Sequence, residues 1–145
     1  MRDFEYVDKV FCFIAEKEQD NGVACLTCEE KVVLWIWHAR GLIENGGIEN
    51  VLIWEDASVE LAEMFDEISL KDLSKVIKKL FSLFPELNPS LNSAKRDKIV
   101  SSKASEIKEQ LDALTSEFYT SMNCIEIYLA KYIRTTMPNW CNTKK

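Results

Sequence analysis

The hydrophobic positions of this chain recur at the spacing of an α-helix along most of its length. Near the start, Phe4, Val7, Phe11 and Ile14 are three or four residues apart, which places them on one side of a helix. No segment shows a convincing strand-like alternation of apolar and polar residues. The pattern therefore predicts a single all-α domain over residues 1–145, with about seven helices.

One helix is apolar on every side and should lie at the centre of the fold. Thr27 and Glu30 have the spacing of a capping box, in which each side chain bonds the backbone N–H of the other residue. The run VVLWIW, residues 32–37, follows, and the helix is expected over 28–44. Gly41 lies inside it at a cost of about 1 kcal/mol relative to Ala. We therefore expect another backbone to approach closely there.

The central helix is expected to end at Asn45, Gly46 and Gly47. Asn and Gly tolerate the left-handed conformation that ends helices and turns the chain. An Asn-Gly pair can also form a β-hairpin, but a hairpin needs alternating strands on both sides. Residues 48–54 instead have helical spacing. The glycines therefore predict a tight corner between two packed helices.

Amphipathic helices are predicted for the remaining chain. Ser58 and Ser69 can each cap a helix, and Pro85 ends the second of these. A long helix should begin at Lys95, and a separate last helix should end at Pro138. The apolar positions of the long helix form a heptad-like seam of Val100, Ala104, Ile107, Leu111, Leu114 and Phe118.

Three stretches in this order resemble a bacterial family known for an acidic DNA-mimic protein. They are IENGGIENVLIW, LAEMFDEISLKDLSKVIKKLFSLFP and LDALTSEFYTSMNCIEIYLAKYI. The resemblance covers roughly residues 28–135. It implies a compact all-helical domain and, more loosely, a protein-binding role. DNA mimicry would further require acidic side chains in a double row at phosphate-like spacing.

The corner also departs from the family pattern. Ile48 stands where the family usually has Phe, and Asn50 stands where Gln is common. Trp54 and Glu55 replace a usual Asn. If these side chains form a site in the family, that site is altered here.

The charge is distributed unevenly along the chain, whose net charge is −6. Residues 1–70 contain 16 Asp or Glu and 5 Lys or Arg, whereas residues 71–145 contain 8 Asp or Glu and 13 Lys or Arg. The acidic half should repel nucleic acid and attract cationic partners. Solubility and attraction between the two halves explain the same asymmetry without a partner.

Most acidic residues near the corner fall on one predicted helix. A solvated helix face is the favoured explanation, and the functional alternative is an anionic surface that binds a basic protein. Trp54 would be a partly exposed anchor for that partner, although core packing explains it as well. This acidic face consists of Glu49, Glu55, Asp56, Glu60, Glu63, Asp66 and Glu67.

The chain has five cysteines, which we expect to be mostly reduced, several of them buried. Cys25 and Cys28 form a CxxC pair. A redox role would usually place this pair after a strand, and none is predicted. A zinc site would have to recruit two of His38, Cys124 and Cys141, because four ligands are required. An incidental pair is favoured, and no metal or cofactor is expected.

His38 is the only histidine, so it would be the general base of any His-based enzyme. It follows Trp37 in the apolar helix, and a buried, hydrogen-bonded histidine is the favoured interpretation. An enzyme would instead need an open pocket beside His38. No nucleophile elbow, phosphate loop or dinucleotide fingerprint accompanies it.

The predicted helix after Ser69 has a basic face of Lys71, Lys75, Lys78 and Lys79. Without interleaved aromatic residues it does not favour direct binding of nucleic acid. A bridge to the acidic half, within one chain or between the subunits of a homodimer, fits better.

No apolar run approaches the roughly 20 residues that span a bilayer, and the acidic start MRDFEYVDK does not resemble a secretory signal. We therefore expect a non-enzymatic cytoplasmic protein that binds a basic protein. The alternative hypothesis is a metal or thiol protein that uses Cys25 and Cys28.

Overall fold

The computed structural model describes residues 2–54, 56–88 and 91–142. These residues form one compact all-α domain without strands, as predicted. The helices are α1 (Asp3–Asn21), α2 (Cys28–Gly46), α3 (Asn50–Ile53), α4 (Glu60–Glu67), α5 (Lys71–Ser82), α6 (Ser93–Ala104) and α7 (Lys108–Thr136). Two single-turn 3-10 helices, η1 (Val23–Cys25) and η2 (Trp140–Asn142), complete the described part.

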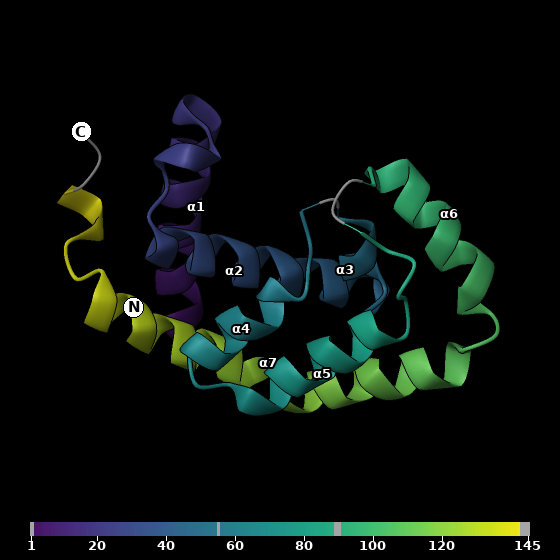
Figure 1. The fold of residues 1–145 in the computed structure, drawn as a ribbon. Coiled ribbons are helices and arrows are strands. Elements are labelled where there is room, and N and C mark those ends of the chain that lie inside the picture. Colours follow the sequence, from purple (N-terminus) through teal and green to yellow (C-terminus); the bar gives the residue numbers. More distant parts are fainter. Residues whose placement is uncertain (1, 55, 89–90, 143–145) are drawn as a thin grey trace.

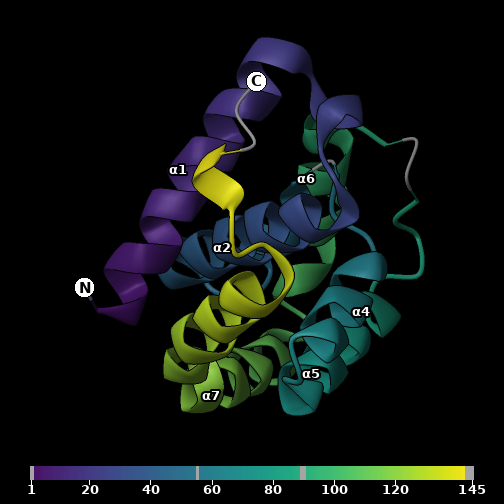
Figure 2. The ribbon, with the colours of Figure 1, turned by 90° about the vertical axis from the view of Figure 1, so that its left-hand side faces the viewer.

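Helix α2 is the centre of the fold, as its apolar sequence predicts. It packs against α1, α3, α4 and α7, and it crosses the middle of the molecule in Figures 1 and 2. Val33, Ile36, Ala39 and Ile43 are completely buried, and Trp37 is buried as well. The remaining helices therefore take their positions from the faces of α2.

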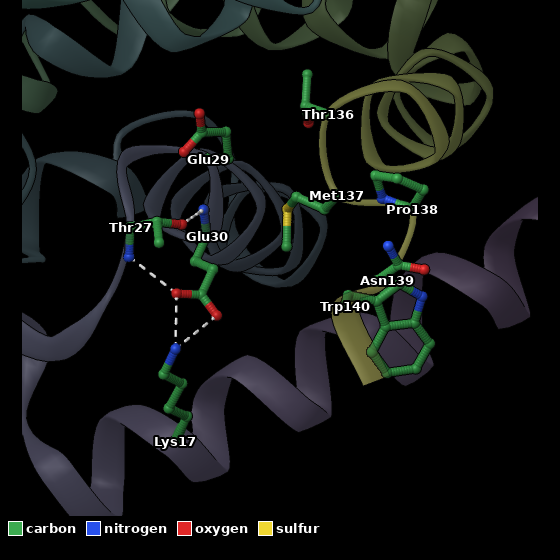
Figure 3. A pocket seen from close by; sticks show the side chains of 9 residues that line it. All are labelled: Lys17, Thr27, Glu29, Glu30, Thr136, Met137, Pro138, Asn139 and Trp140. Carbon is green, nitrogen blue, oxygen red and sulfur yellow. Dashed lines mark hydrogen bonds and ion pairs between the residues drawn. The ribbon is translucent and has the colours of Figure 1, made fainter. Parts of the chain in front are cut away.

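The start of α2 has the predicted capping box. The Thr27 hydroxyl accepts a hydrogen bond from the Glu30 N–H at 3.1 Å, and the Glu30 carboxylate accepts one from the Thr27 N–H at 2.8 Å. Lys17 of α1 donates to the same carboxylate at 3.0 Å (Figure 3). The buried charge of Glu30 is thus paired, and the pair joins α1 to α2.

The glycine corner ends α2 as predicted. Gly47 has a φ of 90°, and its N–H donates to the carbonyl of Ile43 at 2.9 Å. The side chain of Asn50 then reaches back and donates to the carbonyl of Leu42 at 2.9 Å. A Cβ on Gly46 would lie 2.7 Å from the amide nitrogen of Asn50, so a larger residue there would displace the side chain that makes this bond. The positive φ of Gly47 favours glycine directly.

Side chains of α7 also form hydrogen bonds with the backbone of this corner. The N–H of Ile48 donates to the Thr115 hydroxyl at 3.1 Å, and the Tyr119 hydroxyl donates to the carbonyl of Ile43 at 3.1 Å. Next to Tyr119, Phe118 is completely buried. The Asn-Gly-Gly stretch and the Phe-Tyr stretch therefore belong to one tertiary contact, although they are far apart in sequence.

The chain between 93 and 136 is divided differently from the prediction. The predicted long helix breaks at residues 105–107, whereas the predicted last helix is continuous with its second half as α7. The reason is tertiary: α6 packs against α3, while α7 packs against α1, α2 and α5. One straight helix could not reach both sets of partners, and the local sequence contains no Gly or Pro to mark the break.

The predicted cap at Ser69 is wrong. Ser69 has a φ of 71°, Leu70 is the residue before α5, and the Leu70 N–H donates to the carbonyl of Phe65 at 2.9 Å. Ser69 is thus used to reverse the chain at the end of α4, which lets α4 and α5 pack side by side. Ser58 accepts a hydrogen bond from the Glu60 N–H at 3.2 Å near the start of α4.

Arg96 of α6 is a buried residue that the sequence analysis did not identify. The residue is 2% exposed, and the hydrogen bonds of its guanidinium in the described residues all go to backbone carbonyls. It thereby holds the segment between α3 and α4 against the start of α6. The five acceptors belong to Leu52, Trp54, Ala57, Asn88 and Leu91, at 3.1 to 3.3 Å.

The expected close approach of a backbone at Gly41 is wrong. Among the described residues, no atom outside its own helix turn lies within 4 Å of a Cβ placed there. Gly41 thus carries the conformational cost of glycine in a helix without a packing contact that requires it.

Replacing Gly41 with Ala should stabilise the protein by about 0.5 to 1 kcal/mol, because Ala restricts the unfolded chain and fits the helix. Urea denaturation measures the change in the free energy of unfolding. Gly47→Ala is the matched control. It should destabilise by about 1 to 2 kcal/mol, because its φ is positive. Destabilisation by Gly41→Ala would contradict the open site.

Arg96→Lys should lower the free energy of unfolding by about 2 to 4 kcal/mol. The ammonium has fewer donors than the guanidinium and cannot satisfy all five carbonyls. Lys98→Met, on an exposed position of the same helix, should change stability by less than about 0.5 kcal/mol. Equal effects of the two substitutions in urea denaturation would show that the carbonyl cluster has no such role.

Candidate functional site

The predicted acidic face has its centre on α4. Leu61 and Phe65 of this helix are completely buried, whereas Glu60, Glu63 and Glu67 are exposed. The spacing of three and four residues thus separates α4 into a core side and a carboxylate side. Because like charges on one helix side repel one another, these carboxylates favour the approach of a cation.

Part of this charge is paired within the chain. Asp66 lies 3.9 Å from Lys78 of α5, with both side chains exposed, so the pair contributes little to stability. Among the described residues, Glu60 and Glu63 form no ion pair. These two carboxylates are therefore the free charges of α4.

Glu67 accepts a hydrogen bond from the Tyr132 hydroxyl at 3.2 Å, which ties α4 to α7. Partial burial raises the pKa of Tyr132, and the nearby Glu67 charge raises it further. The phenol therefore stays protonated and keeps donating. Glu67 thus stabilises the contact between α4 and α7 in addition to belonging to the acidic face.

The rest of the acidic face is dispersed. Glu49 is half-buried at the corner, where its carboxylate lies beside Gly47, and Asp56 is exposed between α3 and α4. Glu55 lies outside the described residues. Only the α4 carboxylates are thus brought together on one element.

His38 is exposed on α2, so the expectation of a buried histidine is wrong. Its ring lies 4.7 Å from the ring of Trp54, which in turn lies 5.6 Å from Trp35. Trp54 is half-buried and packs against the core, and its edge-on contacts join the α3–α4 segment to α2. The neighbours of α2 cover its other sides and leave position 38 uncovered.

These rings line a hollow of about 260 Å³ between α1, α2 and the α3–α4 segment. Helical spacing on α1 and α2 is the only sequence signal that could have grouped the lining residues of those two helices. No sequence signal places the α3–α4 segment beside them. An adjoining hollow of about 280 Å³ shares Phe11 and His38 and adds Asp8, Trp37, Gly41, Leu42 and Asn45. The first hollow is lined by Phe11, Ala15, Glu18, Leu34, Trp35, His38, Trp54 and Asp56.

Partial burial lowers the pKa of His38, and the negative charges of Glu18 and Asp56 oppose this effect without cancelling it. The imidazole is consequently neutral near pH 7. Both carboxylates act on the imidazole from outside α2: Glu18 belongs to α1 and Asp56 to the α3–α4 segment.

A larger hollow of about 340 Å³ lies where residues 136–140 pass the start of α2 (Figure 3). Its central carboxylate, Glu30, is already bonded to Lys17 and to the Thr27 N–H. This hollow therefore offers less free charge than the one beside His38.

The cysteines do not form a common site. Four of the five are exposed and Cys124 is half-buried, so the expectation of several buried thiols is wrong. Cys25 donates to the carbonyl of Asn21 at 3.1 Å, and Cys28 lies in the first turn of α2. In the described part of the chain, no group of three or more His, Cys, Asp or Glu is arranged to hold a metal ion.

No described helix is long and apolar enough to cross a membrane.

As the sole histidine, His38 should titrate by NMR with a pKa below 6.5. Its lowered pKa favours the neutral form in the folded state, so its contribution to stability is complete above pH 6.5 and is lost as the pH falls through the folded pKa. Glu18→Gln and Asp56→Asn should each lower the pKa further. A midpoint at or above 6.5 would contradict the partial burial.

Comparison with known protein families confirms the resemblance seen in the sequence. The model of the family described as DMP19-like protein, which is a family of DNA mimics, matches residues 24–136. This match covers the corner, the α4–α5 pair and all of α7. Comparison with curated proteins and with solved structures gave no match. The chain therefore belongs to the DMP19-like protein family.

Proposed function

We propose that this protein is a non-enzymatic, DNA-mimic-like regulator that binds a basic, DNA-binding protein through its acidic face. Membership in a family of DNA mimics fits a protein-interaction role. The observation that carries the proposal is the exposed, unpaired position of Glu60 and Glu63 on the solvent side of α4.

The chemistry of these carboxylates suits a basic protein surface. Exposed charges at low ionic strength attract an oppositely charged partner before contact and raise the association rate more than the final affinity. Lys78 neutralises Asp66 at the α5 edge, so a partner would meet the strongest negative charge at Glu60 and Glu63. Binding should therefore start at the first turn of α4.

An enzyme that uses His38 would require an open pocket beside this residue, and the hollow beside His38 meets that requirement. The lining residues of this hollow in the described chain nevertheless include no Ser, Thr, Cys or Lys that could serve as a nucleophile. His38 thus has no hydroxyl, thiol or amine to activate among these described residues, and aromatic rings beside carboxylates suit the binding of a cation.

The double substitution Glu60→Gln/Glu63→Gln should weaken binding to the partner about tenfold at low salt, mainly through a slower association rate. The partner is first identified by affinity capture, and rates are then measured by surface plasmon resonance over a salt series. Binding by the unmodified protein should fall steeply as salt rises.

Glu106→Gln/Glu109→Gln is the matched control, because it removes two exposed charges near the start of α7 that form no ion pair among the described residues. It should leave association within about twofold of the unmodified protein. Binding that is independent of salt, or equally weakened by both double substitutions, would contradict a specific role of α4.

A further inference from the structure

We infer that the hollow between α1, α2 and the α3–α4 segment receives an arginine side chain that projects from the basic partner. The inference rests on the proposed function and names a second, more specific contact within it. The hollow combines the rings of Trp35, His38 and Trp54 with the carboxylates of Glu18 and Asp56.

The ring cluster provides surfaces that attract a guanidinium. Trp54 contacts Trp35 and His38 at centroid distances of 5.6 and 4.7 Å, and Phe11 lines the opposite, α1 side. Cations are attracted to the faces of aromatic rings, most strongly to Trp. A planar guanidinium can also stack on a ring while it donates to a carboxylate, which an ammonium cannot do equally well.

The carboxylates supply the compensating charge from both sides. Glu18 comes from α1, Asp56 from the α3–α4 segment, and Asp8 lines the adjoining hollow. Among the described lining residues of both hollows there is no Lys or Arg. His38 is the only other titratable group in the first hollow, and its lowered pKa keeps it neutral near pH 7, so it does not repel a cation.

The protein already binds two of its own arginines in this way. The Arg40 guanidinium lies 4.8 Å from the ring of Trp37 and pairs with Glu44 at 3.1 Å. Arg134 lies 4.5 Å from the ring of Tyr6 and pairs with Asp3 at 3.2 Å. The hollow beside His38 has the same kind of groups and takes its arginine from outside the chain.

The α3–α4 side of the hollow is held in place before any ligand arrives. Arg96 bonds the carbonyls of Trp54 and Ala57, which flank Asp56 in the sequence, at 3.1 Å. Because these bonds restrict Trp54 and Ala57 before binding, less entropy is lost when a ligand meets this side of the hollow.

The test uses a small ligand and no partner. Nα-acetyl-arginine amide is titrated into the protein while the NMR signals of the His38 imidazole and the Trp54 indole are followed. The isosteric, uncharged citrulline derivative is the matched ligand control. Saturable shifts with arginine, absent with citrulline and weaker with the lysine derivative, are expected.

Bound arginine should also lower the pKa of His38 further, because a like charge beside the imidazole disfavours its protonation. Linkage requires that the same ligand bind more weakly once His38 is protonated. Glu18, Asp56 and Asp8 are the other charged groups that face this region.

Asp56→Asn and Glu18→Gln should each raise the dissociation constant for arginine about tenfold, the size of one charge-assisted contact. Glu60→Gln/Glu63→Gln should leave it unchanged. No saturable shift, equal shifts with citrulline, or tighter binding of lysine than of arginine would overturn the inference.

The two proposals fail separately. Loss of arginine binding, while α4 substitutions still weaken partner binding, would remove the hollow and leave the proposed function. If arginine binds but substitutions of the α4 carboxylates do not weaken partner binding, the proposed function fails and the arginine site in the hollow remains.

Discussion

The reversal of the chain at Gly47 decides where the later elements can lie. Its positive φ lets the N–H return to the carbonyl of Ile43 while α3 leaves in a new direction. Thr115 and Tyr119 of α7 then bond the same corner, so the longest helix is aligned by a turn far from it in sequence. The core around α2 closes because these contacts fix α7 beside it.

The hollow beside His38 depends on a second tertiary contact. Arg96 joins the start of α6 to the segment after α3, and this segment carries Trp54 and Asp56 toward α2. By bonding the carbonyls of Trp54 and Ala57, Arg96 holds the backbone that forms one side of the hollow.

Electrostatic attraction between the two halves of the chain is real but incomplete. Asp66 meets Lys78 and Asp3 meets Arg134, each pair joining the acidic half to the basic half. Exposed pairs of this kind contribute little stability, so their main effect is to decide which carboxylates remain free. What remains at α4 and beside His38 is negative charge in two settings: an open helix side, and a hollow walled by aromatic rings.

The sequence alone determined what short-range hydrogen bonds and periodicity control: the helical class, the capping box at Thr27, the corner at Gly47 and the central position of α2. The acidic side of α4 also followed from helical spacing. Only tertiary packing decided the break at 105–107, the burial of Arg96 and the exposure of His38. Each of these depends on which distant helix covers a residue, and this cannot be predicted from the neighbouring residues in the sequence.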